Sequence, residues 1–403
     1  MPVRIVSIGT ALPTTSVTQR DLRDFFAAQS GADKLTRRLI SGVFDASGIE
    51  TRHTVLSALR RSSRAEDPAT PADSPEQEDP PSPNSSPTPA GSPEGAFVSD
   101  EGALLSPTTG VRNDLYRQAA PRLAAQAAQQ ALHEGELSPD AVTHLITVSC
   151  TGFFAPGLDY RLVRDLGLPE TVERSHLGFM GCAAALPGLR LASQIGEARP
   201  DAVVLVVCVE LCSLHVRDTS DAEQIVAASV FADGAAAALI TGDGPSTAGD
   251  RGPRSSGPAA HPGGMELERF TTALTSEGES DMAWTIEDHG FRMTLTAEVP
   301  RIIGREIRGA VSQLLDGDRA PKTWAVHPGG RSVLDRVEAG LELQPQALAA
   351  SRQVLREAGN MSSATILFIL RRLLHDPAVQ GRIAALAFGP GLTVESALLR
   401  KRS

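Results

Sequence analysis

The sequence predicts an α/β fold built from two similar layered halves, on three observations. Short apolar segments alternate with longer Ala- and Leu-rich segments of helical periodicity. Several short segments are apolar at every position, which is typical of strands covered by helices on both faces. A run rich in Gly, Pro and Ser at residues 242–264 then divides the chain into two parts.

The individual elements follow from the same patterns. Six β-rich segments predict strands at Val3–Ile8, His144–Cys150, Ala202–Val209, Ala235–Ile240, Thr323–Val326 and Ile383–Phe388. Five longer segments predict helices at Leu115–His133, Cys182–Ile195, Arg301–Leu315, Gln346–Ala358 and Ser362–Leu374. We therefore expect an N-terminal half at residues 1–241 and a C-terminal half at 265–403, joined by the loop 242–264.

A second breaker-rich stretch interrupts the first half. Residues 61–100 hold 9 of the 28 prolines and eight serines, with no apolar periodicity. Such a composition cannot bury enough apolar surface to fold. We expect a disordered insertion over about residues 60–110, and we expect deletion of residues 61–100 to leave activity intact.

Composition argues against several classes of protein. A chain of 403 residues, 41% of them hydrophobic, can bury a large core. Its 38 basic and 48 acidic side chains give a net charge of −10, so the basic footprint of a nucleic-acid-binding protein is missing. No apolar run is long enough to span a membrane, and no signal sequence opens the chain. We expect a cytoplasmic protein with no nucleic-acid partner and no membrane insertion.

The strongest local signal surrounds Cys182, in the segment GFMGCAAALPG at residues 178–188. Small residues flank this cysteine where a loop is predicted to enter a helix. There, free backbone N–H groups and the helix dipole lower the pKa of a thiol, as a nucleophile requires. The alternative is a cysteine that merely packs among alanines.

A thiol nucleophile needs a base or a cationic partner. Among nine histidines, His327 ends an apolar segment and precedes Pro-Gly-Gly, at the kind of strand end where α/β sheets bind ligands. Asn360 lies in GNMSSA before an apolar helix, where Asn also serves as a helix cap. Each residue taken singly has a structural explanation.

Taken together, these segments resemble the Cys-His-Asn centre of the thiolase-like condensing enzymes, and specifically the type III polyketide synthases of the chalcone synthase family. The resemblance also rests on PGLDY at 156–160, FADGAA at 231–236 and FGPG at 388–391, and it covers nearly the whole chain outside the two breaker-rich stretches. It implies a thiolase fold with α-β-α-β-α layers, acyl-CoA and malonyl-CoA as substrates, a homodimer, and no cofactor.

The resemblance also implies a mechanism. A Cys182 thiolate, paired with a His327 imidazolium, would take the acyl group from a CoA thioester. His327 and Asn360 would hydrogen-bond the malonyl thioester carbonyl, so that loss of carbon dioxide leaves a stabilised enolate. That enolate would attack the Cys182 thioester, and repetition followed by ring closure would release an aromatic ring or a pyrone, without a metal.

Further positions of a substrate cavity follow from the same resemblance. Phe231 matches one of two phenylalanines that the family places between the CoA tunnel and the cavity, and Met293 falls at the other. The remaining cavity positions are Cys150, Cys212, His215, Trp284, Gly389 and Pro390. Lys34, Arg37 and Arg38 lie roughly where the family keeps CoA-binding residues, although a solvated charged face explains them equally well.

The identity of the product rests on finer similarities. The segments around Cys150 and Cys212 are similar to bacterial enzymes, including those that make 1,3,6,8-tetrahydroxynaphthalene from malonyl-CoA alone. The segment from Met282 to Phe291 looks more like the bacterial alkylresorcinol and alkylpyrone synthases. An indole at Trp284 would close the space that a bulky aromatic starter needs, which favours a medium or long aliphatic starter.

Other hypotheses remain open at this point. They are a ketoacyl synthase of fatty-acid type, and a thiolase-fold partner without catalytic activity. Cys208, Cys212 and His215 fit no common zinc spacing, so we expect no metal. Cys150 and Cys212 are expected to be inert lining rather than a redox pair.

Overall fold

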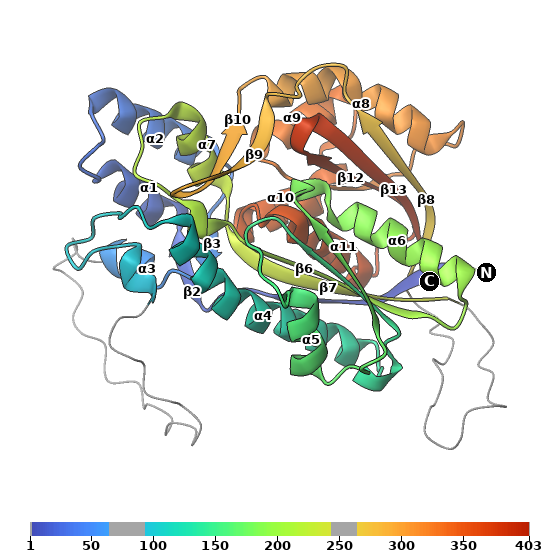
Figure 1. Ribbon diagram of the computed structural model, residues 1–403. Helices are drawn as coiled ribbons and strands as arrows, with labels where there is room; N and C mark the ends of the chain where they lie inside the picture. The colour runs from blue at the N-terminus through green and yellow to red at the C-terminus, as the bar shows by residue number, and fades with distance from the viewer. Residues whose placement is uncertain (1, 64–92, 243–263, 403) are drawn as a thin grey trace.

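The computed structural model describes residues 2–63, 93–242 and 264–402 (Figure 1). A mixed nine-stranded sheet runs through the molecule in the order β11-β12-β13-β8-β1-β7-β6-β4-β5. The N-terminal half contributes β1 (Val3–Ala11), β4 (His144–Ser149), β5 (Glu173–Gly178), β6 (Val203–Leu211) and β7 (Asp233–Gly242). The C-terminal half contributes β8 (Met265–Leu274), β11 (Thr323–Val326), β12 (Gly381–Gly389) and β13 (Thr393–Lys401).

The two halves repeat one strand pattern. In the first half, β4 pairs in parallel with β6, which continues antiparallel to β7 and then β1. In the second half, β11 pairs in parallel with β12, which continues antiparallel to β13 and then β8. The halves join where β1 pairs with β8, through Arg4 with Glu266 and Ile5 with Met265.

Helices and two small two-stranded sheets complete the described part. The helices are α1 (Gln19–Ala27), α2 (Lys34–Ala46), α3 (Ala58–Ser63), α4 (Thr109–Glu134), α5 (Leu158–Leu166), α6 (Ala185–Ala198), α7 (Ala222–Val230), α8 (Val299–Leu315), α9 (Arg331–Gly340), α10 (Ala349–Ala358) and α11 (Thr365–His375). One two-stranded sheet pairs β2 (Thr15–Thr18) with β3 (Thr51–Thr54), which follows it after α1 and α2, and the other is a hairpin of β9 (Met282–Glu287) and β10 (Gly290–Leu295). No described helix combines the length and apolar character needed to cross a bilayer.

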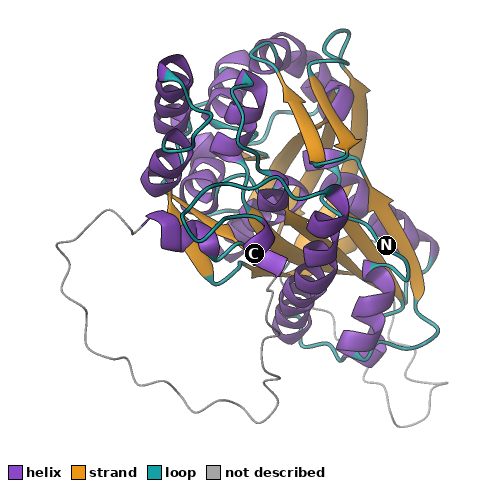
Figure 2. Cartoon of the chain, turned by 60° about the vertical axis from the view of Figure 1, so that its left-hand side comes forward, coloured by secondary structure: helices purple, strands orange, loops and turns teal. Residues whose placement is uncertain are grey.

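Three hydrophobic clusters hold the layers together. One packs α4 and α5 on the outer face of the N-terminal strands, and another packs α8 and α9 on the outer face of the C-terminal strands. The central cluster surrounds α6 and α11, which lie between the two groups of strands (Figure 1). Figure 2 shows helices and strands packed against each other from a second direction. Since β6 is buried at all nine positions, its continuous apolar sequence reflects cover on both faces, as predicted.

All six predicted strands and all five predicted helices are present, but three helices begin differently. The segments predicted as continuous helices from Cys182, Gln346 and Ser362 each begin with a short 3₁₀ turn before α6, α10 and α11. The backbone explains two of these breaks, because Gly181 and Ser362 adopt left-handed conformations with φ of 61° and 46°.

The expectation of a disordered insertion over about residues 60–110 is wrong at its flanks. Residues 58–63 belong to α3, and α4 already begins at Thr109. Phe97 and Val98 are buried in the core beside α4, with the Arg112 guanidinium 5.6 Å from the Phe97 ring centre. Deleting residues 61–100 would therefore remove core side chains. The remainder of this prediction, at 64–92, and most of the predicted loop, at 243–263, lie outside the described residues.

Candidate active site

Cys182 lies in the 3₁₀ turn Gly181–Ala183, which leads from β5 into α6. The left-handed backbone of Gly181 lets this turn pass beneath the FGPG segment, because a Cβ there would lie 2.5 Å from Cδ of Pro390. Gly389 is equally close from the other side, since its Cβ would lie 2.9 Å from the Met180 carbonyl oxygen. The two segments thus place the thiol by direct packing.

Asn360 is oriented by its own hydrogen bonds. Its Oδ1 accepts from the Ser362 backbone N–H at 2.8 Å and lies 4.0 Å from Sγ of Cys182, while Nδ2 lies 3.5 Å from the Gly329 carbonyl. Nδ2 carries two hydrogens, of which one is directed to the Gly329 carbonyl, so the other can be donated to a ligand. Asn360 does not cap α11, because that helix begins five residues later, at Thr365.

His327 lies just after β11, where its backbone N–H donates to the Leu386 carbonyl of β12 at 2.8 Å. The side chain is fully buried, and neither ring nitrogen has a hydrogen-bond partner among the described residues. An unsatisfied buried donor costs about 1–3 kcal/mol, so such a group calls for a functional explanation. Asn360 reaches the same loop through Gly329, which brings all three predicted catalytic residues into one region.

The charge state of this region differs from the expected thiolate–imidazolium pair. Burial raises the pKa of Cys182 to about 12, although hydrogen bonds with Ser362 and Asn360 oppose the shift. Burial also lowers the pKa of His327 to about 3. Neither side chain has a counter-charge to offset desolvation, so burial favours a neutral thiol and a neutral imidazole.

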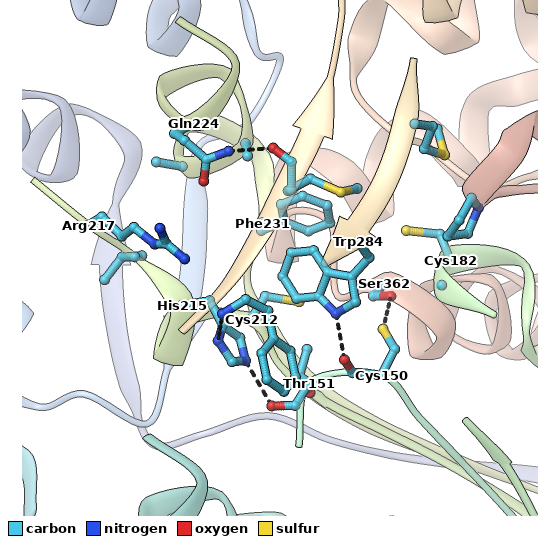
Figure 3. Close-up of a pocket in the computed structure, with 18 residues that line it drawn as sticks. Cys150, Thr151, Cys182, Cys212, His215, Arg217, Gln224, Phe231, Trp284 and Ser362 are labelled. Atoms are coloured by element: carbon cyan, nitrogen blue, oxygen red, sulfur yellow. Dashed lines mark hydrogen bonds between the residues drawn. The ribbon is translucent and has the colours of Figure 1, made fainter. Parts of the chain in front are cut away.

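A cavity of about 60 Å³ opens beside Cys182 (Figure 3). The predicted cavity residues that line it are Cys150, Cys212, His215, Phe231, Trp284, Met293 and Pro390. Trp284 and Met293 are paired across the β9–β10 hairpin. This hairpin was not predicted from the sequence. Gly389 is not among the lining residues. Instead, it packs against the turn that carries Cys182, next to Met180 and Ala183.

An aromatic wall closes one side of the cavity. The His215 ring stacks on Phe291 with centres 4.2 Å apart, and the edge of Trp284 meets both rings. The Trp284 indole N–H donates to the Cys150 carbonyl at 2.7 Å, as Figure 3 shows. These contacts hold the indole in place within the cavity.

His215 is part of this wall and is not available as a base. Its Nδ1 accepts from the Phe291 N–H at 3.0 Å, so the proton lies on Nε2, which donates to the Thr151 carbonyl at 2.8 Å. Burial lowers the pKa of His215 to about 3. The ring is therefore a neutral, fully hydrogen-bonded spacer.

Glu210 is a buried carboxyl near the site that sequence reasoning missed. It accepts hydrogen bonds from the Cys150 N–H, the Thr151 hydroxyl and the Ser363 hydroxyl at 3.0, 2.9 and 2.5 Å. Burial raises its pKa. Its position in the sequence could have identified it, because it is the one acidic residue in the otherwise apolar strand VVLVVCVEL. A buried carboxyl requires several hydrogen-bond donors around it.

The other cysteines near Glu210 are held as thiols. Burial, reinforced by the charge of Glu210, raises the pKa of Cys150 and Cys212 well above the usual range. All four cysteines are free. Since thiolates rather than thiols are reactive, these pKa shifts favour inert lining over a redox pair.

The proposed CoA-binding residues lie elsewhere. Lys34, Arg37 and Arg38 are exposed on α2, and Arg37 donates to the Ala27 carbonyl at 3.1 Å. None of the three lines the cavity, where the basic residue is Arg217, paired with Glu287 at 2.7 Å. A role for the α2 residues in CoA binding stays a prediction.

Comparisons with known proteins bear on the whole arrangement. Residues 99–245 match the N-terminal domain of chalcone and stilbene synthases, and residues 266–402 match the C-terminal domain. The chain is 30% identical over 427 residues to a bisdemethoxycurcumin synthase of Oryza sativa subsp. japonica, covering 99% of this chain and 92% of that protein. It is 29% identical over 405 residues to a probable polyketide synthase 1 of Dictyostelium discoideum, covering 98% of this chain and 11% of that protein.

Solved structures show the same similarity in three dimensions. PKS-I from the brown alga Ectocarpus siliculosus has a TM-score of 0.81 and 26% identity, over 99% of this chain and 98% of that one. The C-terminal type III polyketide synthase domain of Steely1, a type I/III hybrid from Dictyostelium, has a TM-score of 0.80 and 28% identity over 100% of both chains. The predicted thiolase fold is thereby confirmed.

Proposed function

Because the chain belongs to the chalcone and stilbene synthase family, and thus to the type III polyketide synthases, we propose that it condenses malonyl-CoA onto an acyl-CoA starter and cyclises the product. The observation that carries this proposal is that Cys182, which lines the cavity, lies 4.0 Å from the Asn360 amide, which in turn contacts the His327 loop at Gly329. A thiol nucleophile, an amide donor and an imidazole are the groups that decarboxylative condensation requires.

Loading of the starter is the first step. The Cys182 sulfur attacks the acyl carbonyl of the starter thioester while its proton passes to the unpartnered ring of His327. The tetrahedral intermediate then collapses, and the departing CoA sulfur takes the proton back from the imidazolium. Because both residues start neutral, this transfer avoids a standing charge pair in the buried site.

Condensation is the second step. The His327 N–H and the Asn360 Nδ2 donate hydrogen bonds to the thioester carbonyl of malonyl-CoA, where negative charge develops as carbon dioxide leaves. The enolate carbon attacks the acyl group on Cys182, a carbon–carbon bond forms and the thiolate leaves. A neutral imidazole can supply this hydrogen bond when its single proton is on the nitrogen that faces the carbonyl. The nitrogen that accepts and returns the Cys182 proton during loading carries no proton afterwards, so donation from the same nitrogen requires a change of tautomer between the two steps.

We propose a medium or long aliphatic starter, which leads to an alkylpyrone or an alkylresorcinol. The support is the apolar cavity, together with the aromatic wall that holds Trp284 in place. The alternative is priming by malonyl-CoA alone to form 1,3,6,8-tetrahydroxynaphthalene. Cys150 and Cys212 favour it, since they line the cavity and their motifs are similar to such enzymes.

A product assay tests these proposals. Purified protein is incubated with labelled malonyl-CoA and starters from acetyl-CoA to stearoyl-CoA, beside Cys182→Ala, and the products are identified by mass spectrometry. Alkylated pyrones or resorcinols that require an added long starter support the first proposal. A naphthalene from malonyl-CoA alone supports the alternative, and full activity of Cys182→Ala contradicts both.

We also propose that two copies assemble through β5. This strand forms one edge of the sheet, and five of its six residues are exposed. Phe153, Phe179 and Met180 are exposed large apolar side chains, and the rings of Phe153 and Phe179 lie 6.3 Å apart. An open strand beside an exposed apolar patch is the kind of surface that a second sheet edge covers.

A further inference from the structure

The C-terminal end of α7 connects Phe231 to Asn360. The Asn360 N–H donates to the Val230 carbonyl at 2.9 Å, and the Ala232 N–H donates to the Asn360 carbonyl at 2.8 Å. These two bonds form a parallel bridge between Phe231 and Asn360. The backbone position of Asn360 therefore depends on how the end of α7 is held.

Side chains from distant segments hold this helix end. The last carbonyls of a helix lack partners within the helix, so each needs another donor when it is buried. Arg52 Nη1 on β3 donates to the carbonyls of Ala228 and Phe231 at 2.6 and 2.8 Å. Gln19 Nε2, at the start of α1, donates to the Ser229 carbonyl at 2.8 Å.

Burying the Arg52 guanidinium here costs desolvation free energy. It is 4% exposed, and burial lowers its pKa to about 9, with the charge of Asp233 opposing the shift. Asp233 directs its oxygens to the backbone N–H groups of Val55 and Ser213 and to the Ser213 hydroxyl. Among the described residues, the Nε and Nη2 atoms of Arg52 have no hydrogen-bond partner.

The direction of the helix dipole explains why a cation suits this position. A helix C-terminus carries partial negative charge on its free carbonyls, and a guanidinium satisfies them while offsetting that charge. Arg52 binds the Ala228 carbonyl in the last turn of α7 and the carbonyl of Phe231, the residue that is bridged to Asn360. Removing it would leave the Ala228 and Phe231 carbonyls buried without these donors.

We propose that Arg52 is a positioning residue for condensation, which holds Phe231 at the cavity and, through the backbone bridge, the Asn360 amide beside Cys182. This inference rests on the proposed function, because it assumes that Phe231 lines the substrate cavity and that the Asn360 amide binds the malonyl thioester. Arg52 itself does not line the cavity and touches no reacting group. The competing explanation is that Arg52 only supports the fold.

A matched pair of variants separates these explanations. Arg269 Nη1 donates to the Leu314 and Leu315 carbonyls at the end of α8, both at 2.9 Å, and pairs with Asp318 at 3.3 Å. Arg52→Met and Arg269→Met therefore both remove an arginine from a helix C-terminus, but only the helix end held by Arg52 is bridged to Asn360. We expect both variants to lose thermal stability, whereas kcat for carbon dioxide release from malonyl-CoA falls at least tenfold in Arg52→Met alone, with little change in KM.

Two additional variants sharpen the test. Arg52→Lys keeps the charge and one donor, so we expect it to recover part of the lost kcat. In an Asn360→Ala background, Arg52→Met should have little further effect, because residues that act through one another are not additive. Full additivity, or equal kcat in Arg52→Met and Arg269→Met, would overturn the proposal.

Hydrogen exchange tests the inference without relying on turnover. The amide protons of Ala232 and Asn360 should exchange faster in Arg52→Met than in the unmodified protein, and should be unchanged in Arg269→Met. Unchanged exchange in Arg52→Met would count against the positioning role even if activity fell. By contrast, a wild-type protein that releases no carbon dioxide from malonyl-CoA would contradict the proposed function itself.

Discussion

At the scale of single residues, burial decides which protonation states the active site can hold. Cys182 and His327 are both buried, and the pKa of each moves in the direction that disfavours charge. In the proposed mechanism, this pair becomes charged only while a substrate is being attacked. Its chemistry is therefore coupled to proton transfer, and the helix that follows Cys182 does not by itself create a thiolate.

The neutral pair predicts the pH dependence of Cys182 alkylation. A thiol whose pKa is raised to about 12 stays protonated through neutral pH, and its thiolate fraction grows about tenfold per pH unit below the pKa. The rate of inactivation by iodoacetamide should therefore rise steadily from pH 6 to pH 9. Stopped-time assays with mass spectrometry of the Cys182 peptide measure this rate.

The control for that experiment is His327→Ala, which should retain the same slope because His327 carries no charge to stabilise a thiolate in this range. A rate that is independent of pH between 6 and 8, and that becomes pH-dependent in His327→Ala, would instead reveal a preformed ion pair.

Trp284 is expected to control which starters are accepted. Its indole is held in the cavity by the Cys150 carbonyl and by edge contacts with His215 and Phe291. Trp284→Ala should raise kcat/KM for an aromatic starter such as benzoyl-CoA relative to an aliphatic one by at least tenfold, or about 1.4 kcal/mol. Ile286→Ala, at an exposed position of the same strand, should leave the ratio unchanged. An unchanged ratio in Trp284→Ala would show that the indole does not limit starter size.

At the scale of elements, the two central helices mark corresponding positions in the two halves. α6 follows Cys182 by three residues and α11 follows Asn360 by five, and each helix is preceded by a 3₁₀ turn. Both helices belong to the central hydrophobic cluster between the groups of strands. The thiol and the amide therefore approach each other from two halves of the fold.

Gly181 provides a test of how the Cys182 turn is built. Gly181→Ala forces a side chain into a left-handed conformation and against Pro390, where its Cβ would be 2.5 Å from Cδ. We expect a stability loss of more than about 1 kcal/mol and a tenfold or greater loss of acyl transfer to Cys182.

The matched control is Gly167→Ala. Gly167 at the end of α5 has a φ of 66°, and its Cβ would meet no atom within 4 Å. This variant has the same unfavourable backbone conformation without the clash. The free energy of unfolding, measured by thermal unfolding, should therefore fall by about 1 kcal/mol, and acylation should be unaffected. Equal acylation in both variants would mean that the packing against Pro390 does not place the thiol.

At the scale of the whole molecule, assembly through β5 predicts a dimer that a single surface change weakens. Phe179→Asp introduces a charge into the exposed apolar patch beside β5, at a position whose left-handed backbone Asp tolerates. We expect the dissociation constant, measured by light scattering over a dilution series, to rise at least tenfold. Leu274→Asp, on an exposed residue of β8, should have no such effect. A monomeric wild-type protein would contradict this assembly.

Local pattern was sufficient for much of the molecule. The apolar runs at β6 and β11 predicted strands, and the segment that ends at Leu315 predicted α8. These predictions were possible because an element buried on one or both faces has a regular spacing of apolar residues in its sequence. The strand β5 was missed because five of its six residues are exposed, so its sequence carries little apolar periodicity. The β9–β10 hairpin was missed although apolar residues alternate in both strands, at Met282, Trp284 and Ile286 and at Phe291, Met293 and Leu295.

The sequence by itself determined the α/β class and the central strands, because these depend on local periodicity. Its short motifs, through the resemblance to type III polyketide synthases, also predicted the grouping of Cys182, His327 and Asn360. Only the tertiary structure decided that Phe97 belongs to the core, that His215 is a neutral spacer and that Arg52 supports the end of α7. The physical reason is that desolvation and hydrogen-bond satisfaction depend on neighbours from distant parts of the chain. Arg52 and Ala228 are 176 residues apart, and no local pattern links them.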